Sequence, residues 1–370
     1  DIATAFLNAP LDRPVYVEQP HGFADGSKKV CLLRKALYGL KQSPLLWFEA
    51  LTAHLGKLGF SPIDGDPCVF QHTETGALMT VYVDDLLIAG TEDAIAETAN
   101  NLSAKFKVHC LGDVNHYLGC RIIRDRASKR TWICQDGYIH SLAKRFNMED
   151  AYPIDTPMDT NLVLQKANDD YTASANFKKA YQSLIGGIMW PAMICRPDVT
   201  FAASMLSRFL ANPTEQHMSA ANRVLRYLIT TAKMALMIDG AADTDTTLRA
   251  FVDASYGGTT EDRRSIGGYV LTLGHNPIAW KTDVVTTARY LQGFHALNIS
   301  FPITIFEDNE PSIKIALNKD DSARRTRHMD IRFHFIRQEI DQGRINLQWT
   351  PTTNQAADGL TKALGKVAFE

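Results

Sequence analysis

Two adjacent aspartates, Asp84 and Asp85, lie between two apolar segments of this sequence. Carboxylates in such surroundings are costly to bury unless they bind a cation or accept hydrogen bonds. Because hard divalent cations such as Mg²⁺ prefer carboxylate oxygens, the pair is a candidate metal site. An exposed hairpin turn, which favours aspartate for conformational reasons, is the alternative explanation for an isolated pair.

Apolar periodicity predicts the elements that position this pair. Residues 78–89 (LMTVYVDDLLIA) predict a β-hairpin with its turn at the two acids. The spacing of Pro44–Leu58 is helical, and Thr91–Phe106 predicts a second helix with Thr91 as its N-cap. Strand-like segments follow at Leu118–Ile123 and Thr131–Cys134. The first part of the chain is therefore expected to be an α+β domain.

Three domains are expected, with boundaries at residues 1–150, 151–245 and 246–370. A connector rich in Pro, Asp and Thr begins the second range and extends from Tyr152 to Tyr171. Helical spacing then predicts a small helical module over Phe177–Trp190, Val199–Leu210 and Thr214–Thr231. From Leu248 onward, strands separated by glycine turns alternate with helices, which indicates an α/β domain.

The bulk composition is that of an ordinary globular chain. Its 370 residues are 45% hydrophobic and 22% charged, and the formal net charge is −2. A whole-chain basic excess, which marks many nucleic-acid-binding proteins, is absent, so any basic surface must be local. Two clusters are available, and each can equally be a solvated helix or loop face. They are Arg121, Arg124, Arg126, Lys129 and Arg130, and Arg324, Arg325, Arg327, Arg332 and Arg337.

Cysteine usage and hydropathy bear on the compartment. The six cysteines contain no CxxC pair, which argues against a zinc site and indicates reduced thiols inside a cell. No apolar run approaches the ~20 residues of a membrane span. We expect an intracellular protein, in a cytoplasmic particle or the nucleus, with no membrane partner. The sequence opens at Asp1 directly into an apolar segment, so it is expected to be a fragment.

The segments around the acidic pair, in order, carry a resemblance to a known family. Tyr82-Val83-Asp84-Asp85 resembles the YxDD motif of reverse transcriptases. DIATAFLN, from Asp1, resembles the motif whose first strand supplies a third carboxylate, and VYVEQPHGF continues the pattern. LYGLKQSPLLW, from Leu37, is similar to the motif that lines the nucleotide and template pocket. With LGDVNHYLG before the primer grip and RHMDIRFHFIR in the tail, the chain resembles a copia-type (Pseudoviridae) LTR retrotransposon polyprotein, truncated at its N-terminus.

This resemblance implies a fold and a function. The fold would be an α+β reverse-transcriptase palm, without its fingers, with a helical connection or thumb-like module, followed by an α/β RNase H-like domain. The palm and the start of the thumb would occupy residues 1–150, the connector and helical module 151–245, and the RNase H-like domain 246–370. The function would be RNA-directed DNA polymerase with ribonuclease H, acting on an RNA/DNA template-primer and dNTPs.

The resemblance also implies roles for individual residues. Two Mg²⁺ ions, or Mn²⁺ in their place, would lie about 3.5–4 Å apart and be held by carboxylates. Asp1 and Asp84 would bind both ions and Asp85 would assist. Gln42 would face the incoming nucleotide, and Phe6 would be the steric gate against a 2′-hydroxyl. Tyr82 would be a further binding residue of this site. Core packing is the alternative for Phe6, and a place beside the helix N-terminus is the alternative for Gln42.

Three aspartates would serve the RNase H-like domain in the same way. Asp253 in AFVDASYGG, Asp308 in FEDN and Asp358 in NQAADGLTK would bind its two metal ions, although each alone could be a surface residue. The family places a helix with an essential Glu between Asp283 and Glu307, where this sequence has no acid. Glu307 or Glu310 could substitute, but neither lies on that helix. Fewer carboxylates should weaken the binding of hard cations.

Two other functions remain open. The missing Glu and the expected loss of the fingers favour a degenerate, catalytically inactive remnant that binds nucleic acid through the palm, the Lys144–Arg145 neighbourhood and the arginine-rich tail. A structural or protein-interaction domain is the third interpretation, and it requires the order of the motifs to be coincidental. Steep loss of duplex binding with rising salt would separate the second function from the third.

Overall fold

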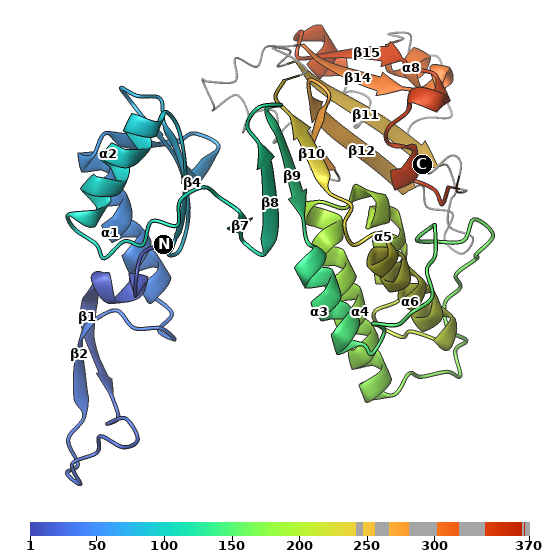
Figure 1. The fold of residues 1–370 in the computed structure, drawn as a ribbon. Helices are drawn as coiled ribbons and strands as arrows, with labels where there is room; N and C mark the ends of the chain where they lie inside the picture. Colours follow the sequence, from blue (N-terminus) through green and yellow to red (C-terminus); the bar gives the residue numbers. More distant parts are fainter. Residues whose placement is uncertain (242–246, 256–265, 281–301, 318–336, 365, 367–370) are drawn as a thin grey trace. The chain divides into compact units, whose positions relative to one another are not determined.

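The computed structural model describes residues 1–241, 247–255, 266–280, 302–317, 337–364 and 366. The chain divides after Val114 into two compact units. Helices and strands of both units are shown in Figure 1. No described helix is long and apolar enough to cross a membrane.

The first unit is built on a four-stranded antiparallel sheet with the order β3-β4-β5-β6. Its strands are Phe60–Ile63, Asp66–His72, Leu78–Tyr82 and Asp85–Ala89. A separate two-stranded ribbon pairs β1 (Pro10–Val17) with β2 (Cys31–Lys35), after the short 3-10 helix η1 (Ala5–Asn8). The predicted hairpin at residues 78–89 is confirmed by the antiparallel pairing of β5 with β6.

Two helices share one core with this sheet. They are α1 (Ser43–Lys57) and α2 (Glu92–Ser103). Trp47, Leu51 and Leu55 of α1 pack with Phe70 of β4 and Leu102 of α2 in one buried cluster. Both helices lie close to their predicted bounds, and the Thr91 hydroxyl accepts a hydrogen bond from Ala94 N, so the predicted N-cap is confirmed.

The second unit contains a second antiparallel sheet and a helical module. The sheet has the order β10-β9-β8-β7, from Leu236–Asp239, Arg130–Cys134, Cys120–Asp125 and His116–Tyr117. The helices are α3 (Asp136–Arg145), α4 (Ala175–Ile194), α5 (Thr200–Ser207) and α6 (Glu215–Thr230), with the 3-10 turn η2 (Pro197–Val199) before α5. Their apolar faces form the largest described core cluster, which includes Tyr181, Ile188, Leu206 and Leu225.

The long helix α4 continues through a proline that the sequence pattern placed just beyond its end. Pro191 lacks the N–H that would bond the carbonyl of Gly187, four residues earlier. The hydroxyl of Tyr138, on α3, donates to that carbonyl at 3.1 Å and satisfies it. The partner comes from 49 residues away in the chain, so the local pattern could not reveal it.

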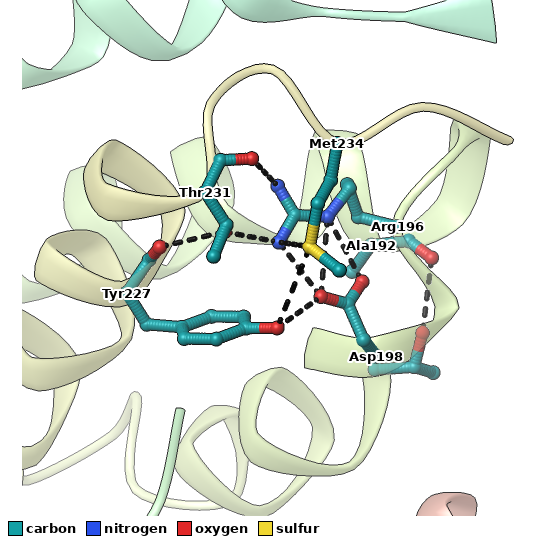
Figure 2. Close-up of polar contacts among 7 residues, drawn as sticks. Ala192, Arg196, Asp198, Tyr227, Thr231 and Met234 are labelled. Carbon is teal, nitrogen blue, oxygen red and sulfur yellow. Dashed lines mark hydrogen bonds and ion pairs between the residues drawn. The ribbon is translucent and has the colours of Figure 1, made fainter. Parts of the chain in front are cut away.

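An ion pair at η2, between the buried Arg196 and the partly buried Asp198, is hydrogen-bonded to the end of α6 (Figure 2). Arg196 is only 2% exposed, and its Nη2 lies 2.7 Å from Asp198 Oδ2. The same guanidinium donates to the Thr231 carbonyl at 3.1 Å, and the Tyr227 hydroxyl donates to Asp198 Oδ2 at 2.8 Å. The buried charge therefore has well-placed polar partners, which is the condition under which such a pair is tolerated.

A five-stranded mixed sheet completes the second unit, with the order β13-β12-β11-β14-β15. Its strands are Asn276–Trp280, Ile266–Leu273, Leu248–Ser255, Ile303–Glu307 and Ile345–Trp349. β11 pairs antiparallel with β12 and parallel with β14, and β14 pairs parallel with β15. The helix α8 (Glu310–Leu317) follows β14, and the 3-10 turns η4 (Thr352–Asn354) and η5 (Asp358–Leu360) follow β15.

The compact units do not divide at residue 150, where the sequence placed a domain boundary. Strands β8 and β9 belong to the second unit because β9 pairs with β10 through Ile133 and Leu236, far along the chain. The mixed sheet is attached to the helical module, since the indole N–H of Trp280 donates to the Ala192 carbonyl at 2.6 Å. The predicted domain boundaries at residues 150 and 245 and the names given to the three ranges stay predictions.

Candidate functional site

The first acidic pair lies at a strained turn between β5 and β6. Tyr82 pairs with Asp85, so Val83 and Asp84 form the turn. Val83 has a φ of 56°, a conformation that is costly for a β-branched residue and is often found at functional sites. The indole N–H of Trp47, which is 2% exposed, donates to the Val83 carbonyl at 2.7 Å. A hydrogen bond from Trp47, a buried residue of α1, therefore holds the turn in place.

The start of the chain lies directly beside this turn. Ile2 N donates to the Asp84 carbonyl at 2.9 Å, and His109 N donates to the Asp1 carbonyl at 2.8 Å. The Ile2 side chain is fully buried and anchors the segment in the core. Asp1 directly precedes Ile2, so the hydrogen bond of Ile2 brings the backbone of Asp1 next to that of Asp84, 83 positions later in the sequence.

The other predicted nucleotide-site residues lie near the same core. Phe6 is buried and its ring lies 4.5 Å from that of Tyr38. Gln42 directly precedes α1 and its side chain makes no cap hydrogen bond. The loop before it is held by Ser43, whose hydroxyl donates to the Leu37 carbonyl at 2.7 Å. Tyr82 is 60% exposed. The roles of Phe6, Gln42 and Tyr82 stay predictions.

Three carboxylates of the mixed sheet form the tightest acidic group of the described residues. Oxygens of Asp253, Glu307 and Asp308 all lie within 4.8 Å of one another. Asp1, Asp84 and Asp85 offer the same oxygen donors, but the described structure gathers them into no comparable three-residue group. The structure therefore supports a metal-binding geometry at the second acidic set more directly than at the first.

Strand register explains why Asp253 and Asp308 meet. Phe251 of β11 is the parallel partner of Phe306 of β14, and their rings stack with centroids 5.0 Å apart. Each aspartate lies two residues beyond one of these phenylalanines, which returns it to the same face of the sheet. Glu307 is the last residue of β14, next to Asp308, and joins them there.

A C-terminal loop that carries the third predicted aspartate, Asp358, packs against the same strands, although Asp358 is not one of the three residues of this group. Gln355 is 5% exposed, and its amide nitrogen donates to the Val252 carbonyl of β11 at 2.8 Å. The hydroxyl of Thr361 donates to Asp253 Oδ2. Gly268, which is opposite Asp253 on β12, lies so close that a Cβ there would come within 2.7 Å of Leu360 Cβ. These contacts clamp η5 against β11 and β12.

The electrostatics of the group are those of crowded carboxylates beside one cation. Burial raises the pKa of Glu307, and the charges of Asp308 and Asp253 raise it further. Lys362 Nζ lies 2.6 Å from Asp358 Oδ1. Partial burial acts to lower the pKa of Lys362, but its hydrogen bond to Asp358 and the charges of Asp358, Asp253 and Asp308 outweigh it, so that pKa is raised.

The sequence offers Glu307 only as a substitute for the family's helix Glu, and it does not single out Lys362. Most of the range between Asp283 and Glu307, where that helix is expected, lies outside the described residues. Lys362 follows Asp358 by four positions in a turn-rich loop, a spacing that brings side chains together only in helical or turn conformations. The four-residue spacing is therefore the one feature of the sequence that could have indicated the ion pair between Asp358 and Lys362.

The basic clusters are only partly free to meet a ligand. On the β8–β9 hairpin, Arg121 pairs with Asp136 at 2.8 Å and Arg130 with Asp239 at 2.9 Å. Arg124 on the same hairpin is exposed. The second cluster, with the exception of Arg337, lies outside the described residues.

Comparisons with known proteins identify relatives of this chain. A family model described as reverse transcriptase (RNA-dependent DNA polymerase) matches residues 1–160. A transposon Ty5-1 protein of Saccharomyces cerevisiae is 35% identical, over 76% of this chain and 91% of its own length. The chain belongs to the copia-type retrotransposon Pol polyproteins. The predicted family is therefore confirmed.

Longer copia-type relatives match the whole chain. The Pol polyprotein from transposon TNT 1-94 of Nicotiana tabacum is 33% identical over 100% of this chain, and that from transposon RE1 of Arabidopsis thaliana is 32% identical over the same share. The chain spans 30% and 26% of these two proteins. A solved foamy viral protease-reverse transcriptase in complex with RNA/DNA hybrid aligns with 97% of this chain and 44% of its own, at 13% identity and a TM-score of 0.48.

Proposed function

We propose that this copia-type chain is an RNA-directed DNA polymerase with a ribonuclease H domain, acting on an RNA/DNA template-primer and dNTPs. The observation that carries the proposal is the backbone hydrogen bond between Ile2 and Asp84, which places Asp1 beside a YVDD turn. In the motif order of this family, those are the two segments that supply polymerase carboxylates. Residues 1–114 would form the palm.

In the polymerase half, the chain's own residues would mainly orient the reactants. Trp47 holds the turn through Val83, which fixes where the carboxylates of Asp84 and Asp85 can point. Gln42, at the head of α1, would contact the incoming nucleotide, and Phe6, packed on Tyr38, would limit the space for a 2′-hydroxyl. Such positioning contributes much of the rate enhancement in phosphoryl transfer.

In the ribonuclease H half, the donor set fits a divalent cation. Asp253, Glu307 and Asp308 offer only carboxylate oxygens, which are the ligands that Mg²⁺ and Mn²⁺ prefer. Asp358 would be a fourth ligand on the loop clamped by Gln355. A bound divalent ion would supply Lewis-acid activation of the phosphate and of the attacking water. We propose that Glu307 takes the place of the family's helix Glu.

Thr352 and Asn309 would orient Asp308 in this site. The Thr352 hydroxyl donates to Asp308 Oδ2 at 2.8 Å, so one carboxylate oxygen is held and the other is left for a cation. Asn309 Oδ1 accepts from Ser312 N at 3.2 Å and caps α8, which fixes the backbone just after Asp308. A ligand whose own partners are hydrogen-bonded keeps its geometry.

Primer extension tests the polymerase proposal. The full chain would be incubated with a poly(rA)/oligo(dT) template-primer, labelled dTTP and Mg²⁺, beside an Asp84→Asn/Asp85→Asn variant and an exposed-acid control, Glu74→Gln. Extension by the parent and by Glu74→Gln, lost in the double variant, is the expected result. Extension that persists in the double variant would overturn the assignment of these aspartates.

A binding measurement identifies the alternative function. If the chain extends no primer but binds the hybrid duplex, with an affinity that falls steeply between low and moderate salt, it acts as a nucleic-acid-binding remnant. The exposed Arg124 of the β8–β9 hairpin would contribute to such a surface, so Arg124→Gln should reduce the slope of log affinity against log salt by about 1.

A further inference from the structure

The two strands that carry the acidic group stop pairing with each other just before it. Among the described residues, the parallel pairing of β11 with β14 ends at Phe251 and Phe306. Asp253 and Asp308 lie two positions beyond these residues. There, β11 still pairs with β12 and β14 with β15, each on its outer side. The separation of Asp253 from Asp308 is therefore not set by direct pairing of the two strands.

The side-chain amide of Gln355 spans the two strands at this point. Its nitrogen donates to the Val252 carbonyl of β11 at 2.8 Å and, over a longer distance of 3.4 Å, to the Phe306 carbonyl of β14. Val252 directly precedes Asp253, and Phe306 directly precedes Glu307. One side chain thus links the two strands where their own pairing ends, next to the acids that they carry.

A third hydrogen bond fixes the orientation of this amide. Gln355 Oε1 accepts from Ala357 N at 3.2 Å. The opposite orientation would place the amide oxygen against two carbonyl oxygens and the amide nitrogen against a backbone N–H, so only one orientation satisfies all three contacts. Gln355 is 5% exposed, which gives water little access to these hydrogen bonds. Solvent would therefore not replace the amide if it were removed.

The chain on either side of Gln355 holds the carboxylates themselves. Thr361 donates to Asp253 Oδ2, and the Thr352 hydroxyl donates to Asp308 Oδ2 at 2.8 Å. Each threonine contacts an acid on one strand, whereas Gln355 contacts the backbone of both strands. The threonines can therefore orient a carboxylate, but the distance between the strands depends on Gln355.

We propose that Gln355 is a positioning residue that sets the separation of Asp253 from Asp308, and thereby the affinity and selectivity of the acidic group for a divalent ion. The inference rests on the proposed function, in that Asp253, Glu307 and Asp308 are taken to bind such an ion. Mg²⁺ demands near-ideal octahedral geometry at about 2.0–2.1 Å, whereas Ca²⁺ accepts longer and more variable distances. A loosened pair of strands should therefore weaken Mg²⁺ more than Ca²⁺.

Ion binding to the full chain tests this inference. In an Asp84→Asn/Asp85→Asn background, which removes the other acidic pair, the chain would be titrated with Mn²⁺ and the free ion measured by electron paramagnetic resonance. Mg²⁺ or Ca²⁺ would then displace the bound Mn²⁺. Gln355→Met keeps the length of the side chain without its amide, and it should lower the affinity for Mn²⁺ by about 10- to 100-fold. The affinity for Mg²⁺ should fall by a larger factor than that for Ca²⁺.

Two further variants keep the test valid and specific. Gln355→Asn keeps the amide on a side chain one methylene shorter, so it should show the same loss if Gln355→Met does not fold, and thermal unfolding verifies the folded state of each variant. Gln348→Met replaces an exposed glutamine of β15, the register partner of Phe306, and should change neither affinity nor selectivity.

The outcomes separate this inference from the proposed function. Parent-like affinity in Gln355→Met and Gln355→Asn, or a loss that is equal for Mg²⁺ and Ca²⁺, would overturn the positioning role. The ion site itself would still stand if Asp308→Asn abolishes binding. A parent that binds no Mn²⁺, or one whose binding is unchanged by Asp308→Asn, would overturn the proposed ion site and the inference with it.

Discussion

The packing of η5 against the mixed sheet yields a prediction from two adjacent glycines. Gly268 lies opposite Asp253, and a Cβ there would meet Leu360 Cβ at 2.7 Å, Thr361 Cγ2 at 3.0 Å and the Leu360 carbonyl carbon at 3.2 Å. A Cβ at Gly267, one residue earlier, would meet no atom within 4 Å. The pair therefore allows the same substitution with and without a collision.

The magnitude follows from the collision distance. Carbon atoms in contact prefer separations of about 3.5–4.0 Å, so Gly268→Ala must displace η5 by about 1 Å. Overpacking of this kind costs about 1–3 kcal/mol. Gly267→Ala, in open space, should instead be neutral or stabilise by about 0.4–1 kcal/mol through the unfolded chain.

Hydrogen exchange of the loop 355–364 measures this displacement where it occurs. If η5 opens locally, Gly268→Ala should speed exchange of the amides of Leu360 and Thr361 by about 5- to 150-fold, which is the exchange equivalent of that cost. Affinity for Mn²⁺ should fall with it, because Thr361, which donates to Asp253, moves with η5. Equal exchange rates in Gly268→Ala and Gly267→Ala would refute the clamped loop.

Three further substitutions test other parts of the structure. Asp198→Asn should lower the free energy of unfolding by about 3–5 kcal/mol in urea titrations, because Arg196 stays buried without its anion; a loss below about 1 kcal/mol would contradict it. Trp47→Phe removes the donor to the Val83 carbonyl and should cost about 1–3 kcal/mol, and an unchanged urea midpoint would argue against that hydrogen bond. Glu307→Gln should change how the stability of the protein depends on pH. Burial raises the pKa of Glu307 in the folded state above its ordinary value of 4.5. The stabilising contribution of protonated Glu307 is therefore complete below pH 4.5 and is lost as pH rises through the folded pKa. In EDTA, the variant should therefore gain stability over the parent as pH rises from about 4 to 8, and a pH-independent difference would contradict this sign.

Local elements of this fold could be predicted from local sequence. The hairpin at residues 78–89, the helix α1 and the Thr91 cap all depend on neighbours within a few residues, and all three were found as expected. The continuation of α4 through Pro191 could not be predicted, because the hydroxyl that donates to the Gly187 carbonyl belongs to Tyr138, in another helix.

The sequence predicted which types of residue form the second acidic group, but not that Asp253, Glu307 and Asp308 come together. Asp253 and Asp308 meet because β11 and β14 pair in a particular parallel register, and no pattern within either strand states that register. Glu307 joins them as the last residue of β14, although strict strand alternation would send it to the opposite face. Lys362 pairs with Asp358, four positions earlier, across the 3-10 turn η5.

One assay tests the proposed division of labour most directly. An RNA/DNA hybrid with a recessed DNA 3′ end, labelled differently on each strand, reports primer extension and RNA cleavage in the same Mg²⁺ reaction. The parent should give both products, Asp84→Asn/Asp85→Asn should lose extension alone, and Asp308→Asn should lose cleavage alone. Loss of both products in either variant would contradict two separate acidic sites, and neither product from a folded parent that binds the hybrid would contradict the proposed enzyme.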